Sequence, residues 1–186
     1  MLIFIKMKRE LSKIIEIPMG VNVEVNGAEL IVNANGKKNS RVFDLMNLSL
    51  EKKENTLVIH EKKASKNDKR MMNTIASHIK NMLEGIATPY VYKLKVCFSH
   101  FPITVEIKGK EAIIKNFLGE RSPRKMTLIE GADIKVDKEI ITVTSFDKEI
   151  AGQSAANFEN ITRIANRDRR IFQDGIFITS KCGEDI

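Results

Sequence analysis

The sequence contains one strand-and-turn pattern twice, and this repeat constrains the fold more than any other feature. Residues 23–27 read Val-Glu-Val-Asn-Gly, and residues 105–109 read Val-Glu-Ile-Lys-Gly. A proline precedes each copy, at Pro18 and Pro102, and a second apolar run follows each copy. A pattern that returns at such a distance indicates a duplicated folding unit.

One amphipathic helix is predicted in each copy, after the strands of that copy. In the first copy the helical pattern stops near Gly85, a residue type that often ends helices. In the second copy Asp147 is a suitable N-cap, and the pattern continues to Ala165. Small and apolar residues at three- and four-residue steps form a face that packs on a sheet. They are Met72, Ile75, Ala76, Ile79, Met82 and Leu83 in the first copy, and Ile150, Ala151, Ser154, Ala155, Phe158, Ile161, Thr162 and Ala165 in the second.

Short apolar or alternating runs predict the strands. Hairpin signals at Asn26-Gly27 and Asn35-Gly36 predict a meander, and residues 90–98 alternate apolar and basic side chains as a half-buried strand does. Further strands are expected at residues 43–50, 56–60, 126–129, 134–136, 140–144 and 176–178. We therefore predict an α+β fold with two tandem duplicated domains, residues 1–86 and 87–186. Each is a small, mostly antiparallel β-sheet with one helix packed on one face.

The charge of the chain narrows the class of partner. The sequence has 31 Lys and Arg against 24 Asp and Glu, a net charge of +7 and a pI near 9.4. The expected partner is anionic, with nucleic acid ahead of a membrane surface or an acidic protein. No segment approaches the roughly 20 apolar residues of a membrane span. Cys97 and Cys182 show no metal-binding or disulfide pattern, which fits a reduced intracellular compartment.

The sequence lacks the motifs of catalysis and cofactor binding. His60, His78 and His100 do not have the short spacing of metal ligands. There is no Gly-x-Ser-x-Gly elbow, no Walker phosphate loop and no Gly-x-Gly-x-x-Gly fingerprint. We therefore expect no enzyme, no catalytic residue, no metal and no cofactor.

Cationic residues cluster at three places in the sequence. A single cluster is often only a solvated surface, and cations at a helix C-terminus also stabilise the helix dipole by about 0.3–1 kcal/mol. Arginine predominates in the second copy, and its planar guanidinium can bind a phosphate through two hydrogen bonds. The clusters are Lys62, Lys63, Lys66, Lys69 and Arg70 before the first helix; Arg121, Arg124 and Lys125 in a loop; and Arg163, Arg167, Arg169 and Arg170 after the second helix.

Four sequence blocks that occur in one order resemble a known family. They are residues 99–102 (SHFP), 116–120 (NFLGE) with the following Pro123-Arg124, 152–156 (GQSAA) and 172–177 (FQDGIF). The first copy adds residues 77–82 (SHIKNM) and Gly85-Ile86. With these blocks, the chain resembles the archaeal and eukaryotic branch of the ribosomal protein L6 family, from about Met7 onward.

The resemblance implies a structural constituent of the large (60S-type) ribosomal subunit, in cytoplasmic ribosomes. It implies binding to large-subunit rRNA near the sarcin-ricin loop and the region where translation factors dock, with neighbouring large-subunit ribosomal proteins as further partners. The C-terminal domain is then the main rRNA-binding domain, and Phe117, Leu118, Ala155 and Phe158 serve packing. The expected rRNA contacts are Lys66, Lys69, Arg70, Lys115, Asn116, Arg121, Arg124, Lys125, Arg163, Arg167, Arg169, Arg170 and Lys181.

For Arg124 and Arg169 we expect that alanine weakens RNA binding and leaves thermal stability nearly unchanged. Two other functions are open at this point. A protein-interaction module would add a partner strand to the edge of residues 90–98 and would bind an acidic protein in an RNase-insensitive way. A metal-assisted hydrolase that uses the histidines would keep stoichiometric metal after purification.

Overall fold

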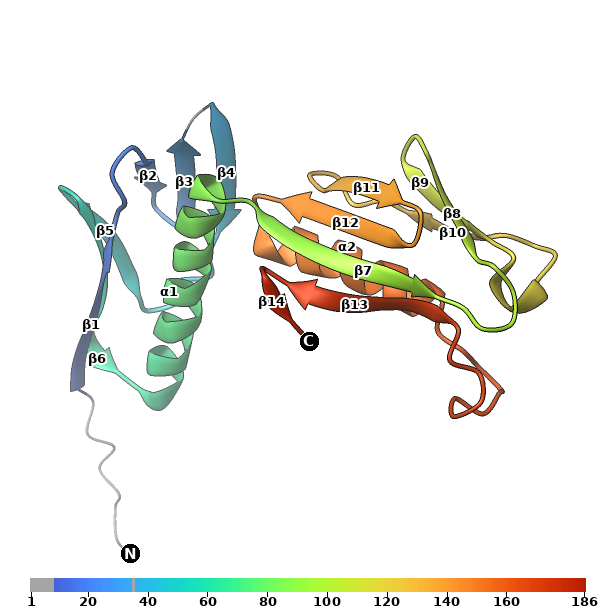
Figure 1. The fold of residues 1–186 in the computed structure, drawn as a ribbon. Coiled ribbons are helices and arrows are strands. Elements are labelled where there is room, and N and C mark those ends of the chain that lie inside the picture. The colour runs from blue at the N-terminus through green and yellow to red at the C-terminus, as the bar shows by residue number, and fades with distance from the viewer. Residues whose placement is uncertain (1–8, 35) are drawn as a thin grey trace, which may run out of the picture. The chain divides into compact units, whose positions relative to one another are not determined.

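The computed structural model of the chain describes residues 9–34 and 36–186. The chain divides into two compact units, and the second unit begins at Pro89. In both units the described residues combine β-strands with a helix, which is α1 in the first unit and α2 in the second (Figure 1). All strand pairs in the described residues are antiparallel.

The first unit contains two three-stranded sheets, with strand orders β1-β6-β5 and β2-β3-β4. The central strands β6 and β3 have neighbours on both sides, and their residues Leu57, Ile59, Leu30 and Val32 are fully buried. These residues form one core with the helix of the unit. The elements are β1 (Arg9–Glu16), β2 (Asn22–Asn26), β3 (Glu29–Ala34), β4 (Lys37–Val42), β5 (Ser49–Lys53), β6 (Thr56–Ala64) and α1 (Lys66–Ala87).

Helix α1 packs against both sheets of the first unit, through β1 and β6 of one sheet and β3 and β4 of the other. Its N-terminus is a capping box. The Asp68 amide donates to the Ser65 hydroxyl, and the Ser65 amide donates to the Asp68 carboxylate. The predicted apolar face is buried, so the predicted helix is confirmed, and it continues past Gly85 to Ala87.

The second unit has a five-stranded sheet of order β11-β12-β7-β13-β14 and a three-stranded sheet of order β10-β9-β8. Helix α2 packs against β7, β12 and β13 of the larger sheet and β10 of the smaller one. The elements are β7 (Tyr90–Cys97), β8 (Thr104–Lys108), β9 (Glu111–Lys115), a 3-10 turn η1 (Phe117–Gly119), β10 (Arg124–Thr127), β11 (Asp133–Asp137), β12 (Ile140–Ser145), α2 (Lys148–Ile161), β13 (Gly175–Lys181) and β14 (Glu184–Asp185).

The start of α2 agrees with the sequence-based prediction, but the helix ends at Ile161, so that Ala165, expected on its packed face, is exposed in the following connection. Asp147 is the N-cap, and its carboxylate accepts a hydrogen bond of 2.8 Å from the Glu149 amide. Ala155, Phe158 and Phe117 are buried to 1% exposure or less, which confirms their packing role. Leu118 is half-buried against the same core.

The two units repeat one topology. The strand order β1-β6-β5 of the first unit corresponds to β7-β12-β11 of the second, and β2-β3-β4 corresponds to β8-β9-β10. A backbone hydrogen bond marks the same place in both units: Ile17 N to Asn55 O at 2.9 Å, and Val96 N to Glu139 O at 2.7 Å. The predicted duplicated α+β fold is confirmed. The structure adds a second sheet in each unit and the short strand β14, and it confirms the strand expected at residues 176–178 as part of β13.

The prediction of a strand over residues 43–50 is wrong. Strand β5 begins only at Ser49, Met46 has a positive φ of 48°, and the Leu48 amide donates to the Leu45 carbonyl in a turn. Phe43 and Leu48 are buried, because they anchor this connection to the core. Apolar residues that anchor a loop therefore produced a pattern similar to that of a strand.

Strand β1 is not among the predicted strands, and strand β7 is not an edge. In β1 the half-buried Lys13 interrupts the row of inward-facing apolar residues, and this weakens the alternating pattern. Strand β7 pairs with β12 on one side and β13 on the other, so the edge proposed for partner binding at residues 90–98 is already occupied.

Candidate nucleic-acid interface

Three connections meet at one end of the second unit. They follow β7 (residues 98–103), β9 (residues 116–123) and α2 (residues 162–174). The resemblance blocks at residues 99–102, 116–120 and 172–177 all lie in these connections or directly beside them. The contacts between the three connections determine which cations are free to bind a ligand.

Asp174 joins the first connection to the third. Its carboxylate is 1% exposed and accepts hydrogen bonds from the Ser99 amide at 2.5 Å and the His100 amide at 3.1 Å. The His100 Nδ1 lies 2.6 Å from the second carboxylate oxygen. Burial alone would raise the pKa of Asp174, but these hydrogen bonds outweigh it and hold the pKa below its ordinary value. Asp174 is therefore a buried anionic tether.

Ser99, His100 and Asp174 have the composition of a hydrolase triad but not its geometry. The Ser99 hydroxyl lies 3.0 Å from the His100 Nδ1, and the Asp174 carboxylate contacts that same nitrogen. In a catalytic triad the serine and the carboxylate contact different ring nitrogens, so that the imidazole can accept the serine proton. This cluster therefore positions a loop and does not activate a nucleophile.

The ring of Phe172 packs against a histidine ring and an arginine guanidinium. His100 stacks on it, with ring centroids 4.9 Å apart, and the Arg167 guanidinium lies 4.8 Å from its centroid. Arg167 also helps to lower the pKa of Glu120, which places its charge near the second connection. The three connections thus form one assembly.

Arg124 fastens the second connection to the end of α2. Its guanidinium donates to both carboxylate oxygens of Glu120, at 2.8 and 2.6 Å, and to the Ile161 carbonyl at 2.6 Å. It also lies 4.2 Å from the centroid of the buried Phe117 ring. The hydrogen bond from Arg124 is the main reason why the pKa of Glu120 is lowered. These contacts give Arg124 a structural role, so we no longer expect its loss to leave stability unchanged, and its role as an RNA contact stays a prediction.

The loop of residues 116–120 has a backbone that few sequences tolerate. Asn116, Leu118 and Gly119 all have positive φ, and the Asn116 side-chain amide donates to the Pro102 carbonyl at 3.0 Å. A Cβ atom on Gly119 would lie 3.3 Å from the Phe101 ring. Asn116 is therefore a residue that shapes the loop, and its role as an RNA contact stays a prediction.

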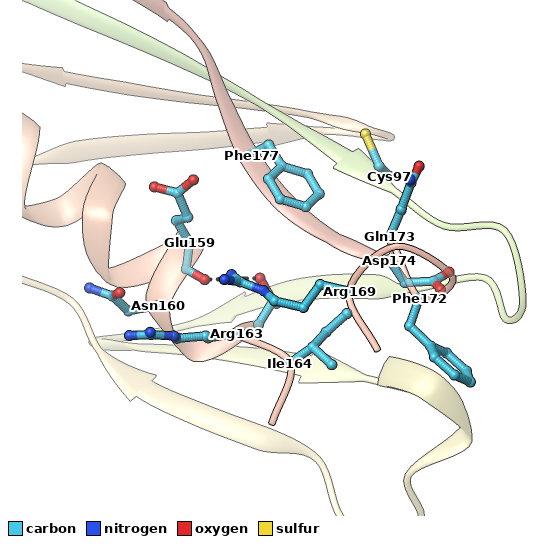
Figure 2. Close-up of a pocket in the computed structure, with 11 residues that line it drawn as sticks. Cys97, Glu159, Asn160, Arg163, Ile164, Arg169, Phe172, Gln173, Asp174 and Phe177 are labelled. Carbon is cyan, nitrogen blue, oxygen red and sulfur yellow. Dashed lines mark hydrogen bonds between the residues drawn. The ribbon is translucent and has the colours of Figure 1, made fainter. Parts of the chain in front are cut away.

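A cleft of about 680 Å³ lies between α2, the connection after it and the start of β13. Figure 2 shows Arg163, Arg169, Phe172 and Phe177 around this cleft, with Cys97 at the end of β7. Phe177 is 41% exposed. Guanidinium groups can bind phosphate oxygens, and an exposed aromatic ring offers a surface on which a base can stack. The cleft is thus suited to a segment of nucleic acid.

Buried contacts beneath the cleft hold its wall in place. The Thr162 hydroxyl accepts a hydrogen bond of 3.0 Å from the Ile176 amide, which joins the end of α2 to β13. Gly175 has no side chain, and a Cβ atom there would lie 3.2 Å from the Phe177 ring. A side chain at position 175 would therefore push the Phe177 ring outward by a few tenths of an ångström.

The structure brings most, but not all, of the predicted cations to this end of the unit. Arg121, Lys125, Arg163, Arg169 and Arg170 are exposed, and within residues 9–34 and 36–186 no ion pair is seen for them. The other predicted residues differ. Lys115 pairs with Glu106 at 2.6 Å, Lys181 lies at the opposite end of β13 from the connections, and Lys66, Lys69 and Arg70 lie in the first unit on the exposed face of α1.

Sequence reasoning does not identify the residues that organise this site. Asp174, His100 and Phe172 lie in the resemblance blocks, but the sequence alone assigns no role to them. Phe177 ends the block at residues 172–177 and otherwise has the pattern of a strand, and Thr162 has the pattern of a helix face. Asp174 and His100 lie far apart in the sequence, and the residues beside each of them give no signal that the two side chains bind each other.

The part of the chain that the structure describes contains no group of three or more His, Cys, Asp or Glu side chains that could hold a metal. The helices within it also do not include one with the length and apolar character needed to cross a membrane.

Comparison with known proteins identifies the family. The family described as ribosomal protein L6 matches residues 17–88 and 101–175, once in each unit. The large ribosomal subunit protein uL6 of Methanococcus vannielii is 41% identical over 170 residues, which cover 91% of this chain and 93% of the relative. The protein of that name from Methanosphaera stadtmanae is 42% identical over 179 residues, which cover 95% of this chain and 97% of the relative. The chain therefore belongs to the ribosomal protein L6 family.

Proposed function

We propose that this chain is a structural constituent of the large ribosomal subunit and binds large-subunit rRNA with the connections at one end of its second unit. Its relatives are named as large-subunit proteins, and members of this family are structural proteins rather than enzymes. The further partners are neighbouring large-subunit proteins in cytoplasmic ribosomes. The bound rRNA is the region near the sarcin-ricin loop, where translation factors dock.

The observation that carries the proposal is the difference between paired and unpaired cations. Arg124 is used inside the fold, whereas Arg163 and Arg169 border a cleft and show no ion pair within the described residues. Arg121 in the second connection, Arg170 in the third and Lys125 in β10 add exposed charge. A set of unpaired guanidinium groups beside the exposed ring of Phe177 matches the phosphates and unstacked bases of folded RNA.

The proposed mechanism is placement without turnover. Phosphate contacts set the position of a protein on RNA, and the irregular shape of the RNA gives selectivity, because an A-form duplex hides its base edges in a deep groove. The Asp174 and Arg124 contacts keep the three connections in one arrangement before RNA arrives. A preformed site loses less conformational entropy on binding.

Sedimentation of cell extract on sucrose gradients, at low and high monovalent salt, tests the ribosomal role. We expect the chain to migrate with the large subunit at both salt concentrations. Migration at the top of the gradient under both conditions would contradict the proposal.

Binding of the purified chain to an rRNA fragment that contains the sarcin-ricin loop tests the site. Arg169→Ala is expected to weaken binding several-fold, while Lys135→Ala, which removes an exposed cation from the middle of β11, changes it little. Equal losses for the two variants would show that total charge, and not this interface, determines the affinity.

A further inference from the structure

The outer edge of β1 in the first unit corresponds to the edge that β13 covers in the second. Strand β7 has β12 on one side and β13 on the other. Strand β1 has β6 on the equivalent side, and no strand of the described residues pairs with its other side. In the second unit, β13 therefore occupies the strand position beside β7. In the first unit, no described residue occupies the equivalent position beside β1.

The registers show which residues of the two strands correspond. Ile15 lies opposite Leu57 in β6, just as Leu94 lies opposite Ile141 in β12. The Ile17 amide makes the same turn contact as the Val96 amide. Ile15 and Ile17 therefore occupy the places of Leu94 and Val96, which are the residues that lie opposite Ile178 and Ile176 of β13.

The helix beside each edge also corresponds. Buried residues follow the same spacing in α1 (Met72, Ile75, Ala76, Ile79, Leu83) and in α2 with its cap (Ala151, Ser154, Ala155, Phe158, Thr162). Leu83 therefore takes the place of Thr162, whose hydroxyl accepts a hydrogen bond from the Ile176 amide of β13. A groove of about 320 Å³ runs here along the edge of β1, lined among others by Ile14, Glu16, Lys80 and Leu83.

We propose that the outer edge of β1 binds an extended segment of another protein as an additional antiparallel strand. An edge strand carries a row of N–H and C=O groups that a partner chain can pair with, and pockets beside the edge select alternate side chains. The groove between β1 and α1 gives such a pocket, and β13 shows how a strand fits the equivalent site.

The backbone geometry defines the binding groups. The Ile17 amide points to the β6 side, so the alternation of an antiparallel strand turns the amides of Ser12, Ile14 and Glu16 to the outer edge. Pro18 occupies the position that Cys97 has in the second unit. Because it is a proline, it has no backbone N–H to donate. The pairing is therefore short and ends at Glu16.

The side chains define the partner. Residues of the added strand that face α1 lie over Ile15 and Leu83 and must be apolar, as Ile176 and Ile178 are in β13. Lys13, which donates to Asn73 at 2.9 Å, takes the place of Tyr92, and the residue opposite it is polar, as Lys181 is in β13. The β13 strand of a second copy of this chain does not supply the segment, because it is paired on both sides within its own unit.

A peptide with the sequence of β13, GIFITSK, tests the proposal on the full chain in solution. We expect the peptide to bind and to slow hydrogen exchange at the amides of Ser12, Ile14 and Glu16, while the amides that face β6 do not change. A peptide of the same composition in scrambled order is the control. Absence of this protection, or equal protection by the scrambled peptide, would overturn the proposal.

Two substitutions at one exposed position separate strand pairing from contact with a side chain. Ile14 is 65% exposed, and proline there removes an outward amide without breaking a bond to β6. Ile14→Pro is expected to weaken peptide binding by about tenfold or more, and Ile14→Thr, which keeps the amide, to change it less than about threefold. Equal binding by both variants, or equal loss in both, would contradict strand addition.

A variant chain that begins at Met7 tests whether the N-terminal residues of this chain, rather than another protein, bind to the outer edge of β1. If removal of residues 1–6 strengthens peptide binding about tenfold, the N-terminal residues of this chain themselves compete for the edge, and the proposal of a separate protein partner is overturned. Unchanged binding supports the separate partner. Thermal unfolding of each variant shows whether the first unit is still folded.

Discussion

The two units share a topology but differ in the segment that comes after the helix. In the first unit the chain leaves α1 at Thr88 and passes to β7, whereas in the second it leaves α2, makes the connection of residues 162–174 and returns as β13. Four arginines of the proposed interface lie on that connection. The comparison teaches that the proposed binding surface lies on a segment that only the second unit has, while the duplicated scaffold is shared.

The units also differ in how their charge is used. Residues 1–88 carry 15 Lys and Arg against 10 Asp and Glu, and residues 89–186 carry 16 against 14. The unit with less net charge has the cleft bordered by unpaired arginines. Local placement of cations, rather than the charge of a whole unit, therefore distinguishes the proposed interface.

The substitution of Asp174 is expected to cause the largest difference between the two units in unfolding free energy. Asp174→Ala removes a buried acceptor of three hydrogen bonds, and we expect the second unit to lose about 3 kcal/mol of unfolding free energy while the first unit loses none. Hydrogen exchange measured on peptides from each unit gives the two values. Asp133→Ala, at an exposed position of β11, is the control and is expected to change either value by less than about 0.5 kcal/mol.

Acid should act on the same tether. The pKa of Asp174 is lowered on folding, so the unfolded chain binds more protons in the interval between the two pKa values. The stabilisation by Asp174 is complete above the unfolded pKa, about 4, and is lost as the pH falls through the folded pKa. Asp174→Asn should flatten this part of the pH dependence in the second unit. A wild-type slope retained in Asp174→Asn would show that another carboxylate causes it.

Arg124 is expected to give the next largest effect. Arg124→Ala breaks the bonds to Glu120 and to the Ile161 carbonyl, and we expect it to destabilise the second unit by about 2 kcal/mol in denaturant unfolding. Lys125→Ala, at the neighbouring exposed position, is the matched control and should stay within about 0.5 kcal/mol of the wild type. Equal stability of the two variants would mean that the Arg124 contacts do not hold the loop.

A smaller effect is expected in the first unit. Ser65→Ala removes the capping-box hydroxyl of α1 and should cost about 1 kcal/mol of unfolding free energy, confined to that unit. Hydrogen exchange of α1 peptides measures the loss, and α2 peptides serve as the internal reference. A loss of the same size in both helices would show that the two units unfold as one.

The smallest effect on stability is expected at Arg169, with a clear effect on RNA. Arg169→Ala should change the unfolding free energy by less than about 0.5 kcal/mol, because this exposed side chain has no ion pair in the described residues. The slope of log affinity against log salt should fall by about 1 if the guanidinium contacts one phosphate. Lys69→Ala on α1 of the first unit is the matched comparison, and a larger change there would reverse the roles given to the units.

Local sequence patterns predicted the helices and the duplication, because helix periodicity, the Asp147 cap and the hairpin turns act within a few residues. The same patterns could not separate Arg124 from Arg169. That difference depends on the Ile161 carbonyl, which lies 37 residues away from Arg124 in the chain, although Glu120 four residues before Arg124 gave a local hint. The Asp174 tether joins residues 75 positions apart, and no local pattern marks such a pair.

The pairing of β7 with β13 has a consequence for the order in which the chain folds during synthesis. The described strands and the helix of the first unit are complete once residue 88 has left the exit tunnel, whereas β7, the first strand of the second unit, waits for β13 at residues 175–181. Until then, the N–H and C=O groups along one side of β7 are a template for wrong pairing. A nascent chain stalled before Gly175 should therefore recruit chaperones through its second unit, while its first unit is already resistant to protease.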